Sequence, residues 1–138
     1  MSAPALAELR HSEHGLPNRW WLYDERFAVL RYHDRRERVV KVWAVRNGAA
    51  WCLSKPWNLP LYGQPALRER PAAPVLVVQS EEAVGAAQRL FPELVCVTWP
   101  GGDCDTVPRI VLGPLKGRAV ILWRNGTPRA ITAMVRLE

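Results

Sequence analysis

Apolar residues in the first half of the chain occur in short runs that polar turns separate. Four of these runs are rich in β-branched and aromatic residues and predict strands: WWLY at 20–23, FAVLRY at 27–32, VVKVWAV at 39–45 and AAWCL at 49–53. Asn47-Gly48 joins the last two, and this dipeptide favours a hairpin because both central residues of a type I′ turn need positive φ. The pattern predicts an antiparallel β meander.

A proline-rich connector separates this half from the next. The segment SKPWNLPLYGQPALRERPAAP at 54–74 contains five prolines and predicts irregular structure with one helical turn at 66–69. The N-terminal residues 1–18 are also irregular in pattern, with at most a short helix at 5–11.

Strand and helix patterns alternate from residue 75 onward. Apolar runs predict strands at 75–78, 94–99 and 119–123, with a further short strand at 109–112. Between the first two, residues 81–91 predict a helix whose apolar stripe is Ala83, Val84, Ala87, Leu90 and Phe91. After Asn125-Gly126 the sequence fits either a last helix over 128–137 or a hairpin. The alternation predicts a parallel α/β sheet.

The predicted fold class is therefore mixed α+β, with an α/β second half. We expect an irregular N-terminus at 1–19, an antiparallel β subdomain with its connector at 20–73 and a short parallel α/β unit at 74–138, packed as one compact domain. Hydrophobic residues make up 49% of the 138 residues, which is typical of a globular chain. The sequence contains neither a long apolar span nor a secretory signal pattern, so we expect a cytoplasmic protein that does not bind membranes.

The net charge of +6 is concentrated in the first half. Residues 1–74 carry 12 Lys/Arg against 7 Asp/Glu, a net +5, and residues 75–138 carry 7 against 6, a net +1. Arginine accounts for 16 of the 19 cations, and its planar guanidinium binds phosphate through two hydrogen bonds. This balance favours DNA or RNA as a partner. The alternative is a generally basic surface.

The densest basic stretch and most of the tryptophans lie in this same half. The stretch RYHDRRERVVK at 31–41 offers Arg35, Arg36, Arg38 and Lys41 as phosphate contacts, or else forms a solvated sheet edge. Aromatic side chains among basic residues are typical of single-strand binding, whereas in a small β unit they also form a core. We expect Trp43 and Trp51 in the core and Trp57 as an exposed platform; the other two tryptophans of this half are Trp20 and Trp21.

Cysteine and histidine offer no strong metal signal. Cys52, Cys96 and Cys104 lack CxxC spacing, and we expect buried reduced thiols. His11-x-x-His14 with Glu13 has the spacing of a metal pair, but it lies in the irregular N-terminus and we expect no metal there.

Polar residues follow the predicted parallel strands at their carboxyl ends, where open α/β sheets bind ligands. These segments are VVQSEEAVGAA at 77–87, TWPGG at 98–102 and VILWRNGT at 120–127. Together with the lead-in PLYGQPALRERPAAP at 60–74, they resemble the TOPRIM domain of phage and plasmid primases and primase–helicases. The resemblance covers residues 20–130, is most specific in TWPGG and the lead-in, and implies an α/β unit shorter than a full TOPRIM domain.

The departures from the TOPRIM pattern concern its chemistry. In the family, a glutamate after the first strand acts as general acid/base and two aspartates hold Mg²⁺; the resemblance places these roles on Gln79, Asn125 and Thr127. Mg²⁺ binds through carboxylates, and an amide does not exchange protons usefully. Glu82 stands in place of the motif's lysine and Arg124 in place of a proline. The resemblance therefore implies a protein that is not an enzyme and needs no cofactor.

Two interpretations remain open for the altered strand ends. Arg124 and Asn125 either form a metal-free anion pocket with the turn amides or only close a surface turn. Glu81 and Glu82 either start a helix favourably, which is the favoured interpretation, or act as ligands, with Glu81, Asp103 and Asp105 as a less favoured relocated metal site.

These observations lead to two main functional hypotheses. The first is an inactive TOPRIM-like protein from a phage or other mobile element that binds DNA or RNA without metal chemistry. The alternative is a protein-binding inhibitor or adaptor that occupies a host or defence protein, using an exposed apolar patch of Trp57, Leu59, Leu61 and Tyr62. A Mg²⁺-dependent nuclease or nucleotidyl transferase is the third and least favoured.

Overall fold

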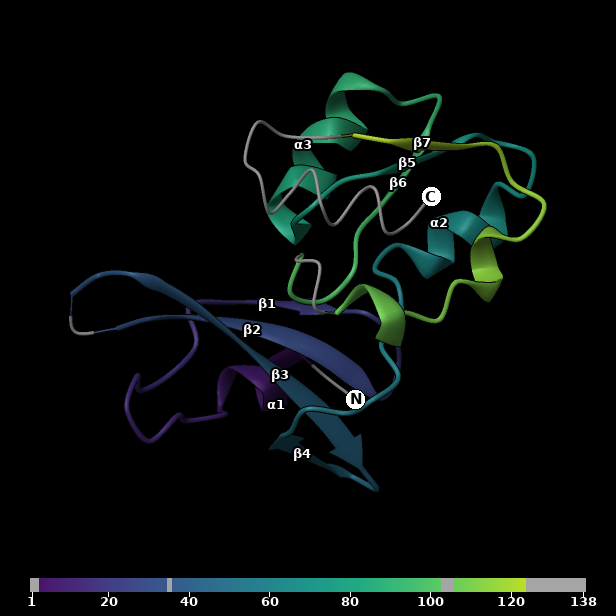
Figure 1. The fold of residues 1–138 in the computed structure, drawn as a ribbon. Coiled ribbons are helices and arrows are strands. Elements are labelled where there is room, and N and C mark those ends of the chain that lie inside the picture. Colours follow the sequence, from purple (N-terminus) through teal and green to yellow (C-terminus); the bar gives the residue numbers. More distant parts are fainter. Residues whose placement is uncertain (1–2, 35, 103–105, 124–138) are drawn as a thin grey trace. The chain divides into compact units, whose positions relative to one another are not determined.

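The computed structural model describes residues 3–34, 36–102 and 106–123. The chain divides into two compact units, Met1–Pro56 and Trp57–Glu138, and the division falls inside the proline-rich connector. Figure 1 shows the elements of both units.

The first unit is an antiparallel meander, as the sequence predicts. Its four strands are hydrogen-bonded in the order β1-β2-β3-β4. The elements are α1 (Ala3–Ala7), β1 (Arg19–Leu22), β2 (Phe27–His33), β3 (Val39–Asn47) and β4 (Ala50–Leu53). The predicted hairpin joins β3 to β4, where Asn47 pairs with Ala50 and Gly48 has a φ of 63°.

One face of this sheet forms a core with α1. Successive strand residues point to opposite faces, so alternate positions share a face. The buried residues of this core are Leu6, Ala28, Leu30, Tyr32, Ala44 and Trp51. The Tyr32 hydroxyl donates to the carbonyl of Leu9 at 3.2 Å, which ties the segment after α1 to the sheet.

The same alternation decides three predictions about side-chain burial. Trp51 lies in the core, which confirms the prediction. Its neighbour Cys52 points the other way and is exposed, so the prediction of a buried thiol is wrong there. Trp43, also expected in the core, is only half-buried on the face away from α1, with its ring 6.0 Å from that of Phe27.

The second unit contains the predicted parallel α/β arrangement. Its sheet has the order β6-β5-β7, and β5 pairs in parallel with both neighbours. The elements are α2 (Gln64–Glu69), β5 (Val75–Val77), α3 (Glu81–Leu90), β6 (Val95–Val97), the 3₁₀ helices η1 (Val107–Arg109) and η2 (Gly113–Leu115), and β7 (Val120–Leu122).

Both faces of this sheet are packed. On one face α3 packs through Val84 and Ala87 against a set that includes Leu76, Val78 and Cys96. The opposite face carries a separate core, formed by Leu61, Leu67, Val75, Val77, Val95, Val97, Trp99, Val107 and Ile110. A buried parallel strand needs apolar residues on both sides, which explains the continuous runs in the sequence.

Two predictions for this unit need correction. Leu90 is exposed, because a helix turns about 100° per residue and so places Leu90 roughly 120° away from Val84. The strand expected at 109–112 is instead the end of η1 followed by a single bridge between Ile110 and Leu59, since Pro108 lies inside η1, where its fixed φ suits a helical turn. Within the described residues, none of the helices is long and apolar enough to cross a membrane.

Candidate nucleic-acid interface

Three cations form a row across the first sheet, on the face away from α1. The register pairs Arg19 of β1 with Arg31 of β2, and Arg31 with Lys41 of β3. Directly paired residues of antiparallel strands project to the same face, with Cα atoms about 5 Å apart, so the row spans roughly 10 Å.

The indole of Trp21 lies among these three cations and orients them. It is buried, and the Lys41 ammonium and the Arg19 guanidinium each lie 4.9 Å from its ring centroid. The guanidinium of Arg31 is 5.9 Å from the same centroid. The Arg31 Nε also donates to Asn18 Oδ1 at 2.9 Å, so this side chain is held in place from a second side. We call Arg19, Arg31 and Lys41 the cation row.

Of the cation row, Lys41 was predicted from the sequence as a phosphate contact. Arg19 and Arg31 were missed as site residues, because twelve sequence positions separate them and only strand pairing brings them together. The signal that could have found them is an arginine followed directly by an aromatic residue in both RWW at 19–21 and RYH at 31–33, combined with a hairpin register.

The β2–β3 turn uses its arginines differently. Asp34 Oδ1 accepts hydrogen bonds from the backbone N–H groups of Arg36 at 2.8 Å and Arg38 at 2.9 Å. The Arg38 Nε donates to Asp34 Oδ2 at 2.9 Å. The hydrogen bond from the Arg38 N–H, aided by the other two, holds the pKa of the Asp34 carboxyl below its ordinary value. Arg38 thus helps to close the turn and Arg36 is exposed beside it.

The end of β5 carries Gln79, the predicted position of the lost acid/base. Its Nε2 donates to the carbonyl of Gly102 at 3.2 Å, which ties the strand end to the TWPGG turn. Gly102 has a φ of 60°, and a Cβ there would lie 2.1 Å from the backbone oxygen of Gln79. The turn therefore packs directly against the strand end, and this close approach requires glycine.

The described residues at this strand end do not by themselves form a Mg²⁺ site. The Oε1 of Gln79 is buried without a hydrogen-bond partner among the described residues, but one neutral amide oxygen is a poor ligand for a hard dication. Glu81 is 4% exposed and begins α3, whose first turn also contains Glu82. The Ser80 side chain caps this helix by accepting from the Ala83 N–H at 3.0 Å. Among the described residues no group of three or more His, Cys, Asp or Glu could hold a metal.

Several predicted positions lie outside the described residues: Arg35, Asp103, Cys104, Asp105, Arg124, Asn125, Thr127 and the segment 128–137. The strands that lead to two of them are described. β7 pairs with β5 so that Val77 lies opposite Leu122, and the Trp123 N–H donates to the Val77 carbonyl at 3.0 Å. The carboxyl ends of β5 and β7 therefore lie side by side, as expected for a parallel sheet.

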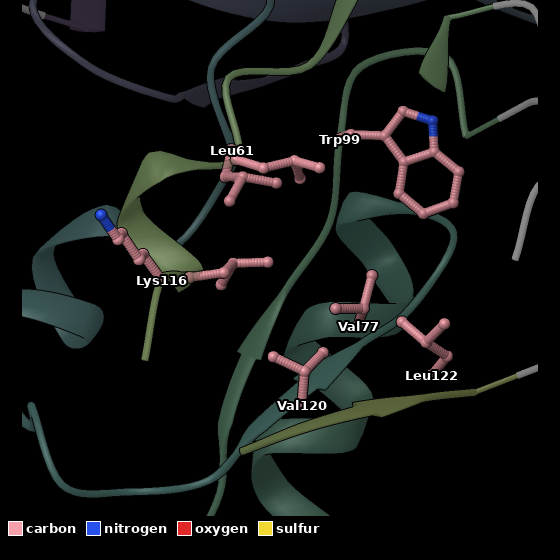
Figure 2. Close-up of a pocket in the computed structure, with 8 residues that line it drawn as sticks. Leu61, Val77, Trp99, Lys116, Val120 and Leu122 are labelled. Carbon is pink, nitrogen blue, oxygen red and sulfur yellow. The ribbon is translucent and has the colours of Figure 1, made fainter. Parts of the chain in front are cut away.

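The second unit contains an apolar pocket of about 420 Å³ on the face of the sheet opposite α3. Figure 2 shows Val77, Val120 and Leu122 on the strands, with the Lys116 ammonium directed away from them. The described lining is Leu61, Val77, Trp99, Leu112, Leu115, Lys116, Val120 and Leu122. No carboxylate, thiol or imidazole belongs to this set, and Leu61 is the one lining residue that the sequence analysis placed in an expected binding surface.

The apolar patch expected at the connector is mostly absent. Leu59 and Leu61 are buried, because Leu59 bridges to Ile110 and Leu61 joins the core beneath it, so that prediction is wrong for both. Tyr62 is half-buried and bridges to Thr98. Trp57 is exposed, as predicted.

The histidine pair at the N-terminus has a structural arrangement. His11 and His14 stack with ring centroids 4.4 Å apart, and His11 Nδ1 accepts from the Glu13 N–H at 3.0 Å. Their rings lie beside Tyr32, at 5.6 and 6.3 Å between centroids. The stacking fixes the loop between α1 and β1 against the sheet.

Comparisons with protein-family models, with curated proteins and with solved structures found no match to this chain.

Proposed function

We propose that this chain is a catalytically inactive TOPRIM-like protein, of phage or other mobile-element origin, that binds DNA or RNA through phosphate contacts and without metal chemistry. The cation row is the observation that carries the proposal. A duplex carries one phosphate per roughly 3.4 Å of helix axis on each strand, so a row of about 10 Å lies within reach of neighbouring phosphates of one strand. The indole between the cations keeps their charges on one face.

The second unit supports the inactive part of the proposal. Gln79 follows β5 where a proton-exchanging carboxylate would be needed, and its amide is engaged with the TWPGG turn. The order β5, α3, β6 is the arrangement that the TOPRIM resemblance implies for this stretch of chain. Binding would then not depend on Mg²⁺.

The test is fluorescence anisotropy of labelled DNA and RNA over a salt series, with Mg²⁺ and with EDTA. We expect the logarithm of the binding constant to fall linearly with the logarithm of salt concentration, and binding to persist in EDTA. Mg²⁺ should only weaken binding, because it competes with the protein for the same phosphates. Lys41→Gln should reduce the magnitude of that slope by about 0.7 to 0.9, the effect of one phosphate contact. Arg31→Gln should act similarly.

Arg68→Gln is the matched control, because Arg68 is exposed in α2 and its loss changes the net charge equally. If Arg68→Gln reduced the slope as much as Lys41→Gln does, the effect would reflect net charge alone and the cation row would not be the site. Absence of binding at low salt, or cleavage or synthesis that needs Mg²⁺, would refute the proposed function.

The second candidate function is a protein-binding inhibitor or adaptor. Trp57 favours it, since an exposed tryptophan is a common anchor at protein interfaces. A stable complex with a host protein that survives high salt and is lost in Trp57→Ala would select this candidate over nucleic-acid binding.

A further inference from the structure

Trp57 is the most conspicuous exposed aromatic residue of the second unit. Its side chain is 72% exposed, although tryptophan normally buries most of its large apolar surface. The backbone just beyond it is firmly held: the Leu59 N–H donates to the Arg109 carbonyl at 2.8 Å and the Val111 N–H donates to the Leu59 carbonyl at 2.9 Å. The indole is therefore displayed from an ordered segment.

Arg109 fixes this residue through two contacts. Its Nε donates to the Trp57 carbonyl at 3.0 Å, and its guanidinium lies 5.0 Å from the centroid of the indole. Arg109 is the last residue of η1, and the nearby residues Val107 and Ile110 belong to the core of the second unit. The guanidinium thus covers one side of the ring and brings a positive charge beside it, and the high exposure of Trp57 leaves the other side open.

We infer that Trp57, held by Arg109, is a stacking platform for an unpaired nucleobase, so that the nucleic acid bound by this protein includes a single-stranded segment. The inference rests on the proposed function and narrows it to a class of ligand. Every base has a π-face that stacks on an aromatic ring without regard to sequence, and a paired base inside a duplex does not offer that face. Fixing the ring in advance lowers the entropy lost on binding.

The positive charge of Arg109 beside the Trp57 ring favours a nucleobase over an apolar protein side chain as the group that stacks there. A guanidinium next to the indole suits a base whose flanking phosphate is negative, whereas an apolar side chain would gain nothing from that charge. The net charge of +6 on the whole chain acts in the same direction.

The experiment compares three labelled probes of equal length: a deoxythymidine 12-mer, a strand of abasic sites that keeps the phosphates but lacks the bases, and a duplex. Trp57→Ala should weaken binding of the deoxythymidine strand roughly 5- to 150-fold, the range expected for one base stacked on an aromatic ring. Binding of the abasic strand and of the duplex should stay within twofold of the unmodified protein. Trp57→Phe should restore most of the loss.

Trp123→Ala is the matched control, because Trp123 is 53% exposed and its ring lies 6.0 Å from that of Phe91. It should leave all three affinities unchanged. Equal weakening of all three probes by Trp57→Ala, or an equal effect of Trp123→Ala, would overturn the inference while leaving the proposed function intact. If the unmodified protein bound none of these probes, and no RNA in the salt series described above, both would fall.

Discussion

Gly102→Ala tests the close contact between the TWPGG turn and the end of β5. A non-glycine residue at a φ of 60° costs about 1–2 kcal/mol. The new Cβ would also lie 2.1 Å from the Gln79 backbone oxygen and 3.3 Å from its carbonyl carbon, so the turn or the strand end has to move. Overpacking of this kind typically costs a further 1–3 kcal/mol, and we expect a total loss of about 2–5 kcal/mol.

Gly117→Ala provides the matched comparison within the same unit. Gly117 has a φ of 75°, yet a Cβ there would meet no atom within 4 Å, so only the backbone term of about 1–2 kcal/mol applies. The difference between the two variants isolates the close approach at about 1–3 kcal/mol. With a urea dependence of about 1–3 kcal/mol per M, the midpoints should differ by roughly 1 M.

The assay should report on the second unit alone, because the chain divides into two units. Cys96 is buried in that unit, so thiol labelling of the Cys96 peptide across a urea series, read by mass spectrometry, follows its unfolding. If Gly102→Ala were as stable as Gly117→Ala, the close contact between the TWPGG turn and Gln79 at the end of β5 would be refuted. Salt-dependent binding by the cation row should be unchanged in both variants.

Two further predictions concern the second unit. The guanidinium of Arg118 donates to the carbonyls of Leu67 at 3.1 Å, Arg70 at 2.7 Å and Ala73 at 2.8 Å. Arg118→Ala should therefore lower the free energy of unfolding by about 2–4 kcal/mol in a urea titration. Arg68→Ala, at an exposed position, should change it by less than about 0.5 kcal/mol. Burial raises the pKa of the Cys96 thiol, so the unfolded chain ionises this group at lower pH than the folded chain does. The free energy of unfolding should therefore be unaffected below about pH 8.5 and fall as the pH rises further. Cys96→Val should lack that part of the fall, and an equal fall in both proteins would contradict the prediction.

The local patterns of the sequence were sufficient for most of the secondary structure. Asn47-Gly48 predicted the hairpin. The apolar run at 75–78 predicted β5, and the apolar stripe with acidic residues in the first turn after it predicted α3. The predicted burial was wrong at Leu90, where the position around the helix decides exposure. The predicted strand was wrong at 109–112, where proline changes the backbone conformation. Cys52 failed because a one-residue error in assigning the face of a strand inverts burial.

The candidate site was only partly predictable for a related reason. Lys41 and Trp57 were selected from the density of basic and aromatic residues, which is a local property. Arg38 belonged to the same dense stretch but pairs with Asp34, and a sequence cannot show whether a cation faces an acid or a ligand. Oppositely charged residues that lie close in sequence within one turn, such as Asp34 and Arg38, are brought together by the turn and pair with each other.

The sequence by itself determined the antiparallel and parallel sheets and the absence of carboxylates at the positions to which the TOPRIM resemblance points, because strand patterns and residue identities are local. Only the tertiary structure decided which cations lie together. Arg19, Arg31 and Lys41 become neighbours through the registers of two strand pairs, and Trp57 meets Arg109 across 52 residues. Such contacts depend on long-range pairing, which the hydrophobic pattern permits but does not specify.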